Sequence, residues 1–451
     1  MKKYFGTDGI RRIANTELSP EFVYKVAKAG AYVLAKHSNH RPTILIGRDT
    51  RISGTLIESA MTAGFLSYGA NVKLLGVIPT PAVAYLTKKL NADASVVISA
   101  SHNTYEFNGI KFFSNKGMKI PDEIEEEIEE LIDSKKIEEL TAENDKIGVS
   151  EICPEYLYEY ADFIIDIFKN VKIPENFKIA LDTANGATYN VAEYIFKMLG
   201  INYQIINNTP DGININKDCG STHLENLKKY VLDNHLSLGI AYDGDGDRCL
   251  AVDELGNEIN GDILLALLSN YLKNNSKLNK DTIVATVMSN LGLKKYAKEN
   301  NMKFVETKVG DRYVLEEMLK NGYNLGGEQS GHIILLDYNP TGDGILTSLM
   351  LIRTLIESNL KASEIRKKIC IYPQVLVNAK VKQEKKYDYF EDEEIQKEIK
   401  KLEEEFLDEG RVLIRTSGTE PLVRVMIEGT DINYISEKAS NLADLIEKKL
   451  N

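Results

Sequence analysis

The stretch Thr43-Ile44-Leu45-Ile46-Gly47-Arg48-Asp49 decides the fold class, because it reads as an apolar strand that ends in a polar turn. A helical segment follows from about Thr55, and a second apolar strand begins near Val72. The order of strand, turn, helix and strand returns at 178–207 and again at 282–308. Short apolar strands that alternate with helices of this length indicate α/β units rather than an all-β or all-helical fold. The three copies predict three similar α/β domains in series.

The length and the last segment together predict a fourth domain. A chain of 451 residues is too long for one ordinary domain, since domains average roughly 150 residues. The last segment departs from the repeat, because it reads as strand, helix, strand, strand and helix from 374 onward. We therefore expect a smaller C-terminal α+β domain. The expected boundaries are 1–150, 151–250, 251–368 and 369–451.

Charge and hydropathy exclude some classes of function. The net charge of −12 argues against nucleic acid as the main partner. The longest apolar stretch, at 263–272, is far shorter than the roughly 20 residues of a membrane span. The first nine residues carry lysines but no apolar run, so we expect a cytoplasmic protein without a secretion signal or a membrane partner. Any anionic substrate must therefore be bound by a local cluster of Lys and Arg.

The first candidate site is the turn Ser99-Ala100-Ser101-His102-Asn103, which follows an apolar strand. Small and polar residues after a strand form a tight turn that presents a hydroxyl, so Ser101 is a candidate nucleophile or phosphoryl carrier. An ordinary polar turn is the alternative, in which His102 and Asn103 make only local hydrogen bonds. Lys111 follows ten residues after Ser101 on a nearby expected strand, where its cation can face a phosphate.

The second candidate site is Asp243-Gly244-Asp245-Gly246-Asp247-Arg248. Alternating carboxylates and glycines let the backbone curl, so that hard oxygen ligands converge on one cation. An EF-hand calcium loop is an alternative, because Glu254 falls at its twelfth position. Arg248, however, occupies the sixth position, where that loop needs Gly, and both flanks read as strands rather than helices. A small set of carboxylates with room for a phosphate oxygen favours magnesium over a merely solvated acidic turn.

Two further turns carry polar groups suited to a sugar phosphate. The turn Gly326-Gly327-Glu328-Gln329-Ser330-Gly331-His332 offers the donors and acceptors that sugar hydroxyls require. The turn Arg415-Thr416-Ser417-Gly418-Thr419-Glu420-Pro421 can hold a phosphate through backbone N–H groups and the guanidinium of Arg415. The basic segments 9–12 and 47–54 are surface turns by default, and either can add cations to an anion site.

Taken together and in this order, these segments and Phe5-Gly6-Thr7-Asp8-Gly9-Ile10-Arg11 resemble the α-D-phosphohexomutase superfamily. The resemblance covers nearly the whole chain. Three segments are most similar to the phosphoglucosamine mutase branch of this superfamily: Glu328-Gln329-Ser330, Val309 to Val314 and Gly418 to Met426.

The resemblance implies four domains around a central cleft, each of which supplies one loop. It implies that Ser101 is carried as phosphoserine and that Mg²⁺ is held by Asp243, Asp245, Asp247 and a phosphoserine oxygen. The remaining implied site residues fall into two groups. The catalytic group assists proton transfer or neutralises charge and comprises Arg11, His102, Lys111, Arg248 and His332. The substrate-binding group comprises Glu328 and Ser330 for the sugar, and Arg415, Ser417, Gly418, Thr419 and Arg424 for the phosphate that is not transferred.

The implied activity is that of a cytoplasmic isomerase of amino-sugar metabolism that supplies peptidoglycan precursors. It interconverts glucosamine 6-phosphate and glucosamine 1-phosphate through glucosamine 1,6-bisphosphate, and such enzymes are often homodimers. A phosphomannomutase or phosphoglucomutase on the same scaffold is the first alternative. A non-catalytic sugar-phosphate binding protein and a calcium sensor are more distant ones.

Two positions depart from the family pattern. Thr104 follows Ser-His-Asn where the family usually has Pro, so we expect a less rigid turn there. Arg12 stands where the family usually has Gly, which costs about 1 kcal/mol or more if the position requires a positive φ.

Overall fold

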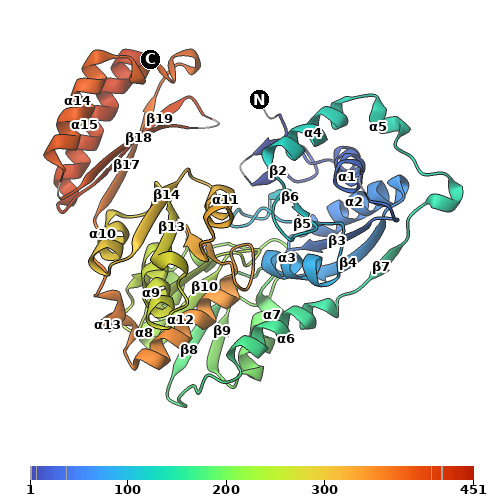
Figure 1. Cartoon of the computed structure of the whole chain (residues 1–451), viewed down its shortest axis with the longest axis horizontal. Coiled ribbons are helices and arrows are strands. Elements are labelled where there is room, and N and C mark those ends of the chain that lie inside the picture. Colours follow the sequence, from blue (N-terminus) through green and yellow to red (C-terminus); the bar gives the residue numbers. More distant parts are fainter. Residues whose placement is uncertain (1–2, 7, 37, 408, 418–419) are drawn as a thin grey trace. The chain divides into compact units, whose positions relative to one another are not determined.

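The computed structural model describes residues 3–6, 8–36, 38–407, 409–417 and 420–451, and it separates into two compact units. The first unit is formed by Met1–Met288 and Met302–Lys367, and the second by Ser289–Asn301 and Lys368–Asn451. The described residues form three mixed sheets and one antiparallel sheet (Figure 1). The predicted class of three α/β domains plus a smaller α+β domain is confirmed.

The three mixed sheets share one four-stranded core. In each core, the strand that comes first in sequence lies between the second and the third core strands and runs parallel to both. The fourth core strand pairs antiparallel with the third. The core strands are β3 (Thr43–Arg48), β4 (Asn71–Val77), β5 (Ala94–Ile98) and β6 (Phe107–Ser114); β8 (Lys178–Asp182), β9 (Asn202–Ile206), β10 (Leu238–Tyr242) and β11 (Cys249–Asp253); and β13 (Thr282–Thr286), β14 (Lys303–Thr307), β15 (Leu325–Gly327) and β16 (Ile333–Leu335). The repeat predicted from the sequence is therefore confirmed.

This shared topology sets where the chemistry lies. In each mixed sheet the connection from the third to the fourth core strand leaves at a carboxyl end, where α/β proteins place their ligands. Those three connections hold Ser101, the triple-Asp turn and the Glu328 turn respectively. Short strands complete the sheets: β1 (Phe5–Gly6), β7 (Ser150–Ile152) and β12 (Glu258–Ile259) lie at edges, and β2 (Gly9–Ile13) lies between β1 and β6.

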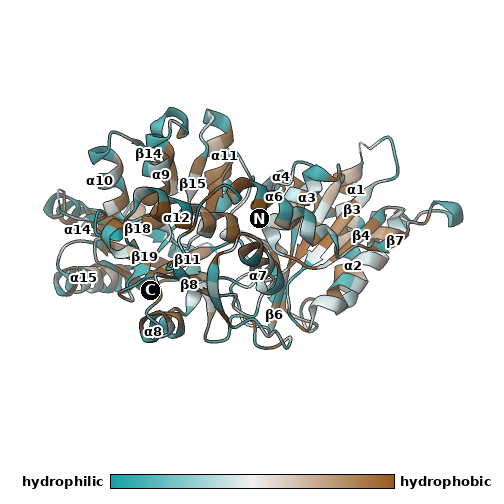
Figure 2. Ribbon diagram, turned by 90° about the horizontal axis from the view of Figure 1, so that it is seen from below, coloured by the Kyte–Doolittle hydropathy of each residue, from teal (hydrophilic) through white to brown (hydrophobic). Residues whose placement is uncertain are grey.

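Amphipathic and buried helices cover the mixed sheets. In the first sheet, Val26 of α1 and Phe65 of α2 pack in one core with Ile44, Ile46 and Val96 of the strands. The strands carry hydrophobic colour and the turns are mostly hydrophilic (Figure 2). The helices of the first unit are α1 (Pro20–Ala35), α2 (Gly54–Tyr68), α3 (Thr80–Lys89), α4 (Asp122–Asp133), α5 (Lys136–Glu139), α6 (Tyr156–Phe168), α7 (Tyr189–Met198), α8 (Glu225–Asp233), α9 (Gly261–Asn274), α11 (Asp311–Asn321), α12 (Gly344–Ser358) and α13 (Ala362–Arg366). Helix α10 (Leu291–Glu299) belongs to the second unit. Among the described residues, no helix is long and apolar enough to cross a membrane.

The second unit has a sheet in the order β17-β19-β18, which is antiparallel throughout. Its elements are β17 (Gln374–Lys380), α14 (Glu393–Glu405), β18 (Arg411–Thr416), β19 (Leu422–Glu428) and α15 (Ile432–Leu450). Val423, Val425 and Ile427 point from β19 into a core that includes Leu442 and Ile446 of α15. The period-2 pattern on the strand and the helical spacing on α15 create this α+β packing.

Arg12 does not have a positive φ, so the condition under which a cost was expected at this position is not met. It lies within the extended strand β2, paired with Asn108, and its guanidinium stacks over the rings of Tyr4 and Phe22. The residue that does require glycine is Gly9, which has a φ of 73° and would place a Cβ 2.4 Å from the carbonyl oxygen of Ile110.

The acidic helix α4 is less solvated than its sequence suggests. Ile128 and Ile132 are buried, and Glu129 is buried too, at 8% exposure. Its carboxylate accepts hydrogen bonds from the backbone N–H groups of Lys3, Tyr4 and Phe5 at 2.5–2.7 Å. Hydrogen bonds to a charged acceptor are stronger than neutral ones, so this glutamate anchors the first described strand.

Glu129→Gln should lower the thermal stability of the protein. The variant keeps only one acceptor oxygen and turns an amide toward N–H donors, a loss of about 1.5–3 kcal/mol. We expect the apparent Tm to fall by about 3 °C or more in a calorimetric scan. Glu130→Gln, an exposed neighbour on the same helix with the same charge change, is the control. Equal Tm values for the two variants would contradict the anchoring role.

Candidate active site

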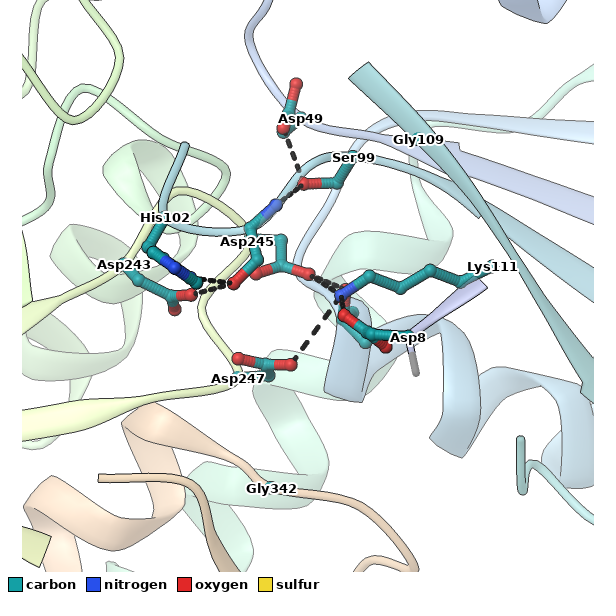
Figure 3. Close-up of polar contacts among 12 residues, drawn as sticks. Asp8, Asp49, Ser99, His102, Gly109, Lys111, Asp243, Asp245, Asp247 and Gly342 are labelled. Carbon is teal, nitrogen blue, oxygen red and sulfur yellow. Dashed lines mark hydrogen bonds and ion pairs between the residues drawn. The ribbon is translucent and has the colours of Figure 1, made fainter. Parts of the chain in front are cut away.

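Ser101 and the triple-Asp turn come together from two different sheets. The Ser101 hydroxyl donates a hydrogen bond of 2.7 Å to Asp243 Oδ2, although 142 residues separate the two in sequence. Both side chains are buried, Ser101 at 1% exposure and Asp243 at 0%. The loops that the sequence singled out as the first and second candidate sites therefore form one site (Figure 3).

The Ser101 turn is held from below by buried polar groups. Ser101 has a φ of 51°, which is uncommon for a residue other than glycine. Its N–H donates to Ser99 Oγ at 2.9 Å, and the Ser99 hydroxyl donates to Asp49 at 2.6 Å. The missing proline at Thr104 predicted a less rigid turn. The turn is nevertheless held, because the Thr104 carbonyl accepts a hydrogen bond from Arg51. The segment 47–54 is likewise not a plain surface turn, since Asp49 and Arg51 are fully buried.

The three aspartates have the geometry of a cation site. One oxygen from each of Asp243, Asp245 and Asp247 lies within 4.8 Å of the others, and all three residues are buried. Asp245 Oδ1 and Asp247 Oδ1 accept no hydrogen bond from any residue that the structure describes. Burial and the two neighbouring carboxylates raise the pKa of Asp243 well above its ordinary value. Orphaned oxygens and crowded charge fit a hard divalent cation, so the residues present suit a metal.

The calcium-sensor alternative does not fit this structure. Strands β10 and β11 flank the triple-Asp turn, where an EF-hand has helices. Glu254, which that reading needs as the twelfth ligand, instead accepts hydrogen bonds from the backbone N–H and the hydroxyl of Ser363. Its carboxylate is therefore occupied in the fold.

Two cations balance the acidic turn. Lys111 is buried at 1% exposure, and its Nζ lies 2.9 Å from both Asp245 Oδ2 and Asp8 Oδ2. Burial alone would lower the pKa of Lys111, but the surrounding carboxylates outweigh burial and raise it. Arg248 donates its backbone N–H to Asp243 Oδ1 at 3.1 Å, and its guanidinium lies 3.9 Å from Asp247. Both side chains thus remain positively charged beside Ser101.

His102 and Arg11 complete the surroundings of the hydroxyl. His102 Nδ1 lies 3.3 Å from Ser101 Oγ. Burial, with Arg248 and Arg11 nearby, lowers the pKa of His102 to about 4. The imidazole is therefore neutral at pH 7. Arg11 donates to Asn103 Oδ1 at 2.9 Å and pairs with Asp8 at 3.0 Å, so it lies at the rim of the same turn.

The third loop reaches this cluster through His332. Its Nδ1 lies 3.5 Å from Asp247 Oδ2, while Nε2 accepts the Gly342 N–H at 3.0 Å. The carboxylate of Glu328 accepts the Gly310 N–H at 3.2 Å, and burial raises the pKa of Glu328. Ser330 lies at the tip of the turn and is partly exposed. The expected sugar-binding residues, Glu328 and Ser330, therefore share one loop with His332, which faces the triple-Asp turn.

Three members of the site were missed by sequence reasoning as functional residues. Asp8 pairs with Lys111, Lys119 and Arg11, and Lys119 also pairs with Asp311, which lies 3.4 Å from His332. Asp8 and Asp311 stand inside segments that carried the family resemblance, whereas Lys119 gave no signal. Lys119, Asp311 and His332 line a pocket of about 190 Å³, which Arg312, Leu315 and Ile334 also line.

In the second unit, two arginines lie directly opposite each other. Arg415 of β18 pairs in register with Arg424 of β19, so both side chains stand on one face of the sheet. Burial and the Arg424 charge lower the pKa of Arg415. Ser417 is buried, and its hydroxyl oxygen accepts the Glu420 N–H at 3.3 Å. Gly418 and Thr419 lie outside the described residues. Like charges opposed in this way are destabilising unless an anion lies between them.

Comparison with known proteins places these features in a family context. Domain families described as phosphoglucomutase/phosphomannomutase alpha/beta/alpha domains I, II and III and C-terminal domain match residues 2–139, 156–256, 260–371 and 376–445. A curated phosphoglucosamine mutase from Acetivibrio thermocellus is 54% identical over the full length of both chains.

Two solved structures share the fold across the chain. A phosphoglucomutase/phosphomannomutase family protein from Burkholderia thailandensis has a TM-score of 0.80 at 21% identity and covers 100% of this chain and 99% of its own. The N-acetylphosphoglucosamine mutase of Aspergillus fumigatus, solved with GlcNAc-6P and magnesium, has a TM-score of 0.72 at 17% identity. It covers 100% of this chain and 96% of its own.

Asp245→Asn should weaken the binding of a divalent cation. The change removes one of three carboxylate charges while keeping the shape of the turn, so we expect Kd for Mg²⁺ in calorimetric titration to rise about tenfold or more. Asp233→Asn, an exposed residue of α8 with the same charge change, should bind as the unmodified protein does. Equal affinities in the two variants would refute a cation site at this turn.

Proposed function

We propose, since the chain belongs to the phosphoglucosamine mutase family of phosphohexomutases, that it interconverts glucosamine 6-phosphate and glucosamine 1-phosphate. It is an isomerase that works by phosphoryl transfer. The observation that carries the assignment of roles is the buried Ser101 hydroxyl at 2.7 Å from the acidic turn. A nucleophile beside a cation site is the arrangement that phosphoryl transfer requires.

We assign Mg²⁺ to Asp243, Asp245 and Asp247, with an oxygen of phosphorylated Ser101 as a further ligand. The orphaned oxygens of Asp245 and Asp247 support this assignment. When bound, the ion would neutralise charge on the phosphoryl group and polarise it toward attack. Phosphoserine alone adds nearly −2 beside three carboxylates, so the site depends on the positive charges of Lys111 and Arg248 as well.

The proposed reaction runs in two mirrored transfers. In the first, O1 of glucosamine 6-phosphate attacks phosphoserine 101, so that an O1–P bond forms and the Oγ–P bond breaks. The proton lost from O1 is returned to Ser101 Oγ, and the product is glucosamine 1,6-bisphosphate. After the sugar turns over, Ser101 Oγ attacks the 6-phosphate, O6 takes the proton, and phosphoserine is restored.

The protein's own groups would serve these steps in different ways. His102 is neutral and 3.3 Å from Ser101 Oγ, so it can exchange a proton with that hydroxyl. His332 and Arg11 lie near enough to the cluster to meet the attacking oxygen of the sugar. Lys111, fixed by Asp8 and Asp245, would face the phosphoryl oxygens as a permanent charge.

The remaining residues would bind the parts of the sugar phosphate that do not react. Glu328 and Ser330 would hold sugar hydroxyls, and each half-reaction presents the sugar in a different orientation to them. Arg415, Ser417, Gly418, Thr419 and Arg424 would hold the other phosphate. Opposed guanidiniums grip phosphate by charge rather than by sugar shape, which suits a site that must accept either end of the substrate.

The wider context remains a set of proposals. We place the enzyme in the cytoplasm, with a small sugar phosphate as its partner rather than nucleic acid or a membrane. The boundaries at 150, 250 and 368 and the homodimer remain predictions.

Ser101→Ala should abolish turnover without unfolding the protein. It removes only the phosphoryl carrier, so the rate of glucosamine 6-phosphate conversion should fall at least about 10³-fold. After incubation with glucosamine 1,6-bisphosphate, intact-mass analysis should find one covalent phosphate on the wild-type protein and none on the variant. Ser59→Ala, which alters an exposed serine of α2, should resemble the unmodified protein in both assays. Retained turnover in Ser101→Ala would rule out the phosphoserine route.

Substrate preference separates the proposal from its nearest rival. We expect kcat/KM for glucosamine 6-phosphate to exceed the values for glucose 6-phosphate and mannose 6-phosphate by about tenfold or more, because hydrogen-bonding groups in a sugar site discriminate through their partners. Parallel assays with the three sugar phosphates at one Mg²⁺ concentration measure this. A preference for mannose or glucose 6-phosphate would favour a phosphomannomutase or phosphoglucomutase instead.

A further inference from the structure

Arg51 is a buried arginine that the proposed chemistry does not use. It follows β3 and is 1% exposed. Its Nε donates to Asp49 at 2.8 Å. Its other four N–H groups all donate to backbone carbonyls of one loop, the loop that carries Ser101. The acceptors are Ser101 and Asn103 for Nη2, and Thr104 and Phe107 for Nη1. A guanidinium has five donors in a rigid fork, so every one of them is used.

Asn216 holds the same loop from the neighbouring sheet. It is 2% exposed, and its Nδ2 donates to the carbonyls of Ser101 at 2.8 Å and Asn103 at 2.9 Å. These are the two carbonyls that Arg51 Nη2 also contacts. A carbonyl oxygen has two lone pairs, so each of these oxygens takes one donor from each side.

The loop has little freedom between these two side chains. Ser101 keeps a left-handed φ of 51°, a conformation that persists only where the surroundings impose it. A Cβ at Gly244 would lie 2.6 Å from the Ser101 carbonyl oxygen, so the acidic turn packs directly against the loop. The Thr50 hydroxyl donates to the Asn185 carbonyl, and the Ile52 N–H to the Gly212 carbonyl, which joins the Arg51 segment to the second sheet.

We infer that Arg51 and Asn216 are positioning residues that lock the Ser101 loop to both sheets and so set the distance between Ser101 Oγ and the acidic turn. The inference rests on the proposed function of Ser101. Phosphoserine and free serine must occupy one place in two half-reactions, and both positioning residues are buried, Arg51 at 1% and Asn216 at 2% exposure. Hydrogen bonds to the loop carbonyls do not involve the Ser101 hydroxyl, so they can hold the loop whether Ser101 is esterified or free.

Kinetics should separate this positioning role from a merely structural one. A displacement of about 1 Å at a reacting group can cost about 100-fold in rate. The clamp, which is the set of hydrogen bonds from Arg51 and Asn216 to the Ser101 loop, includes no residue of the turns that are expected to bind the sugar and the phosphate. Loosening it should therefore lower kcat and leave KM nearly unchanged, whereas general unfolding would lower the active fraction and the Tm together.

The decisive variants are Asn216→Gly and Asn216→Asp. Asn216 has a φ of 56°, which glycine and aspartate tolerate, so neither variant adds much backbone strain. Glycine removes the donors, and aspartate turns a carboxylate oxygen toward the two carbonyls. We expect kcat to fall about 10–100-fold with KM within about twofold. Asn359→Gly, at a φ of 53° in the exposed C-cap of α12, is the matched control and should keep full kcat.

Hydrogen exchange supplies a readout that does not depend on activity. Amides of a peptide spanning 99–107 should exchange faster in both Asn216 variants and in Arg51→Lys, and at the unmodified rate in Asn359→Gly. Arg51 and Asn216 donate to the same two carbonyls. The effect of the double variant Arg51→Lys/Asn216→Gly on exchange should therefore be smaller than the sum of the effects of the two single variants.

The outcomes distinguish the two proposals. Unchanged kcat and unchanged exchange in both Asn216 variants would overturn the clamp, and so would a fall in kcat matched by an equal fall in folded protein. An unmodified protein without mutase activity would overturn the proposed function, while exchange of the loop would still test whether the clamp holds it.

Discussion

The site depends on confining three aspartates to one buried corner. Burial raises the pKa of Asp243, and the repulsion between carboxylates this close raises it further. Lys111 answers part of this charge, and Asp8 in turn fixes Lys111. One oxygen each of Asp245 and Asp247 accepts no hydrogen bond from the described residues, so these oxygens are available to a cation that would balance the remaining charge. Ser101 lies at hydrogen-bond distance from this turn, so in the proposed reaction its phosphoryl group would be carried where positive charge can stabilise it.

The repeated sheet topology explains how so many polar groups reach one place. Each mixed sheet ends its third strand in a turn, and the three turns carry the serine, the aspartates and the Glu328–His332 segment. Carboxyl ends of parallel strands open toward a shared edge, so repetition of one unit supplies three loops of different chemistry. The strands that precede these turns position Ser101 and Asp243. The buried Arg51 also positions the Ser101 loop, because it donates a hydrogen bond to the Ser101 carbonyl.

Sequence reasoning reached the features that are encoded locally. The strand–turn–helix repeat, the Ser101 turn and the Asp243–Asp247 turn are each contained in a short segment, so pattern and spacing were enough to find them. Lys119, Arg51 and Glu129 escaped as functional or anchoring residues because their partners lie far away. Lys119 meets Asp311 across 192 residues, and Glu129 meets Tyr4 across 125. Arg51 looked like a surface cation, since a buried guanidinium is recognised only when its five acceptors are known.

The central claim is that Ser101 and the aspartate trio share one divalent cation. Crystals soaked with Mn²⁺ and measured by anomalous diffraction test this most directly, because Mn²⁺ prefers the same oxygen ligands and its position can be located without assumption. The account predicts a single peak among the carboxylates of Asp243, Asp245 and Asp247, with the oxygen of Ser101 or of its phosphate as a further ligand. A cation bound elsewhere, or at the aspartates with Ser101 turned away from it, would contradict the account.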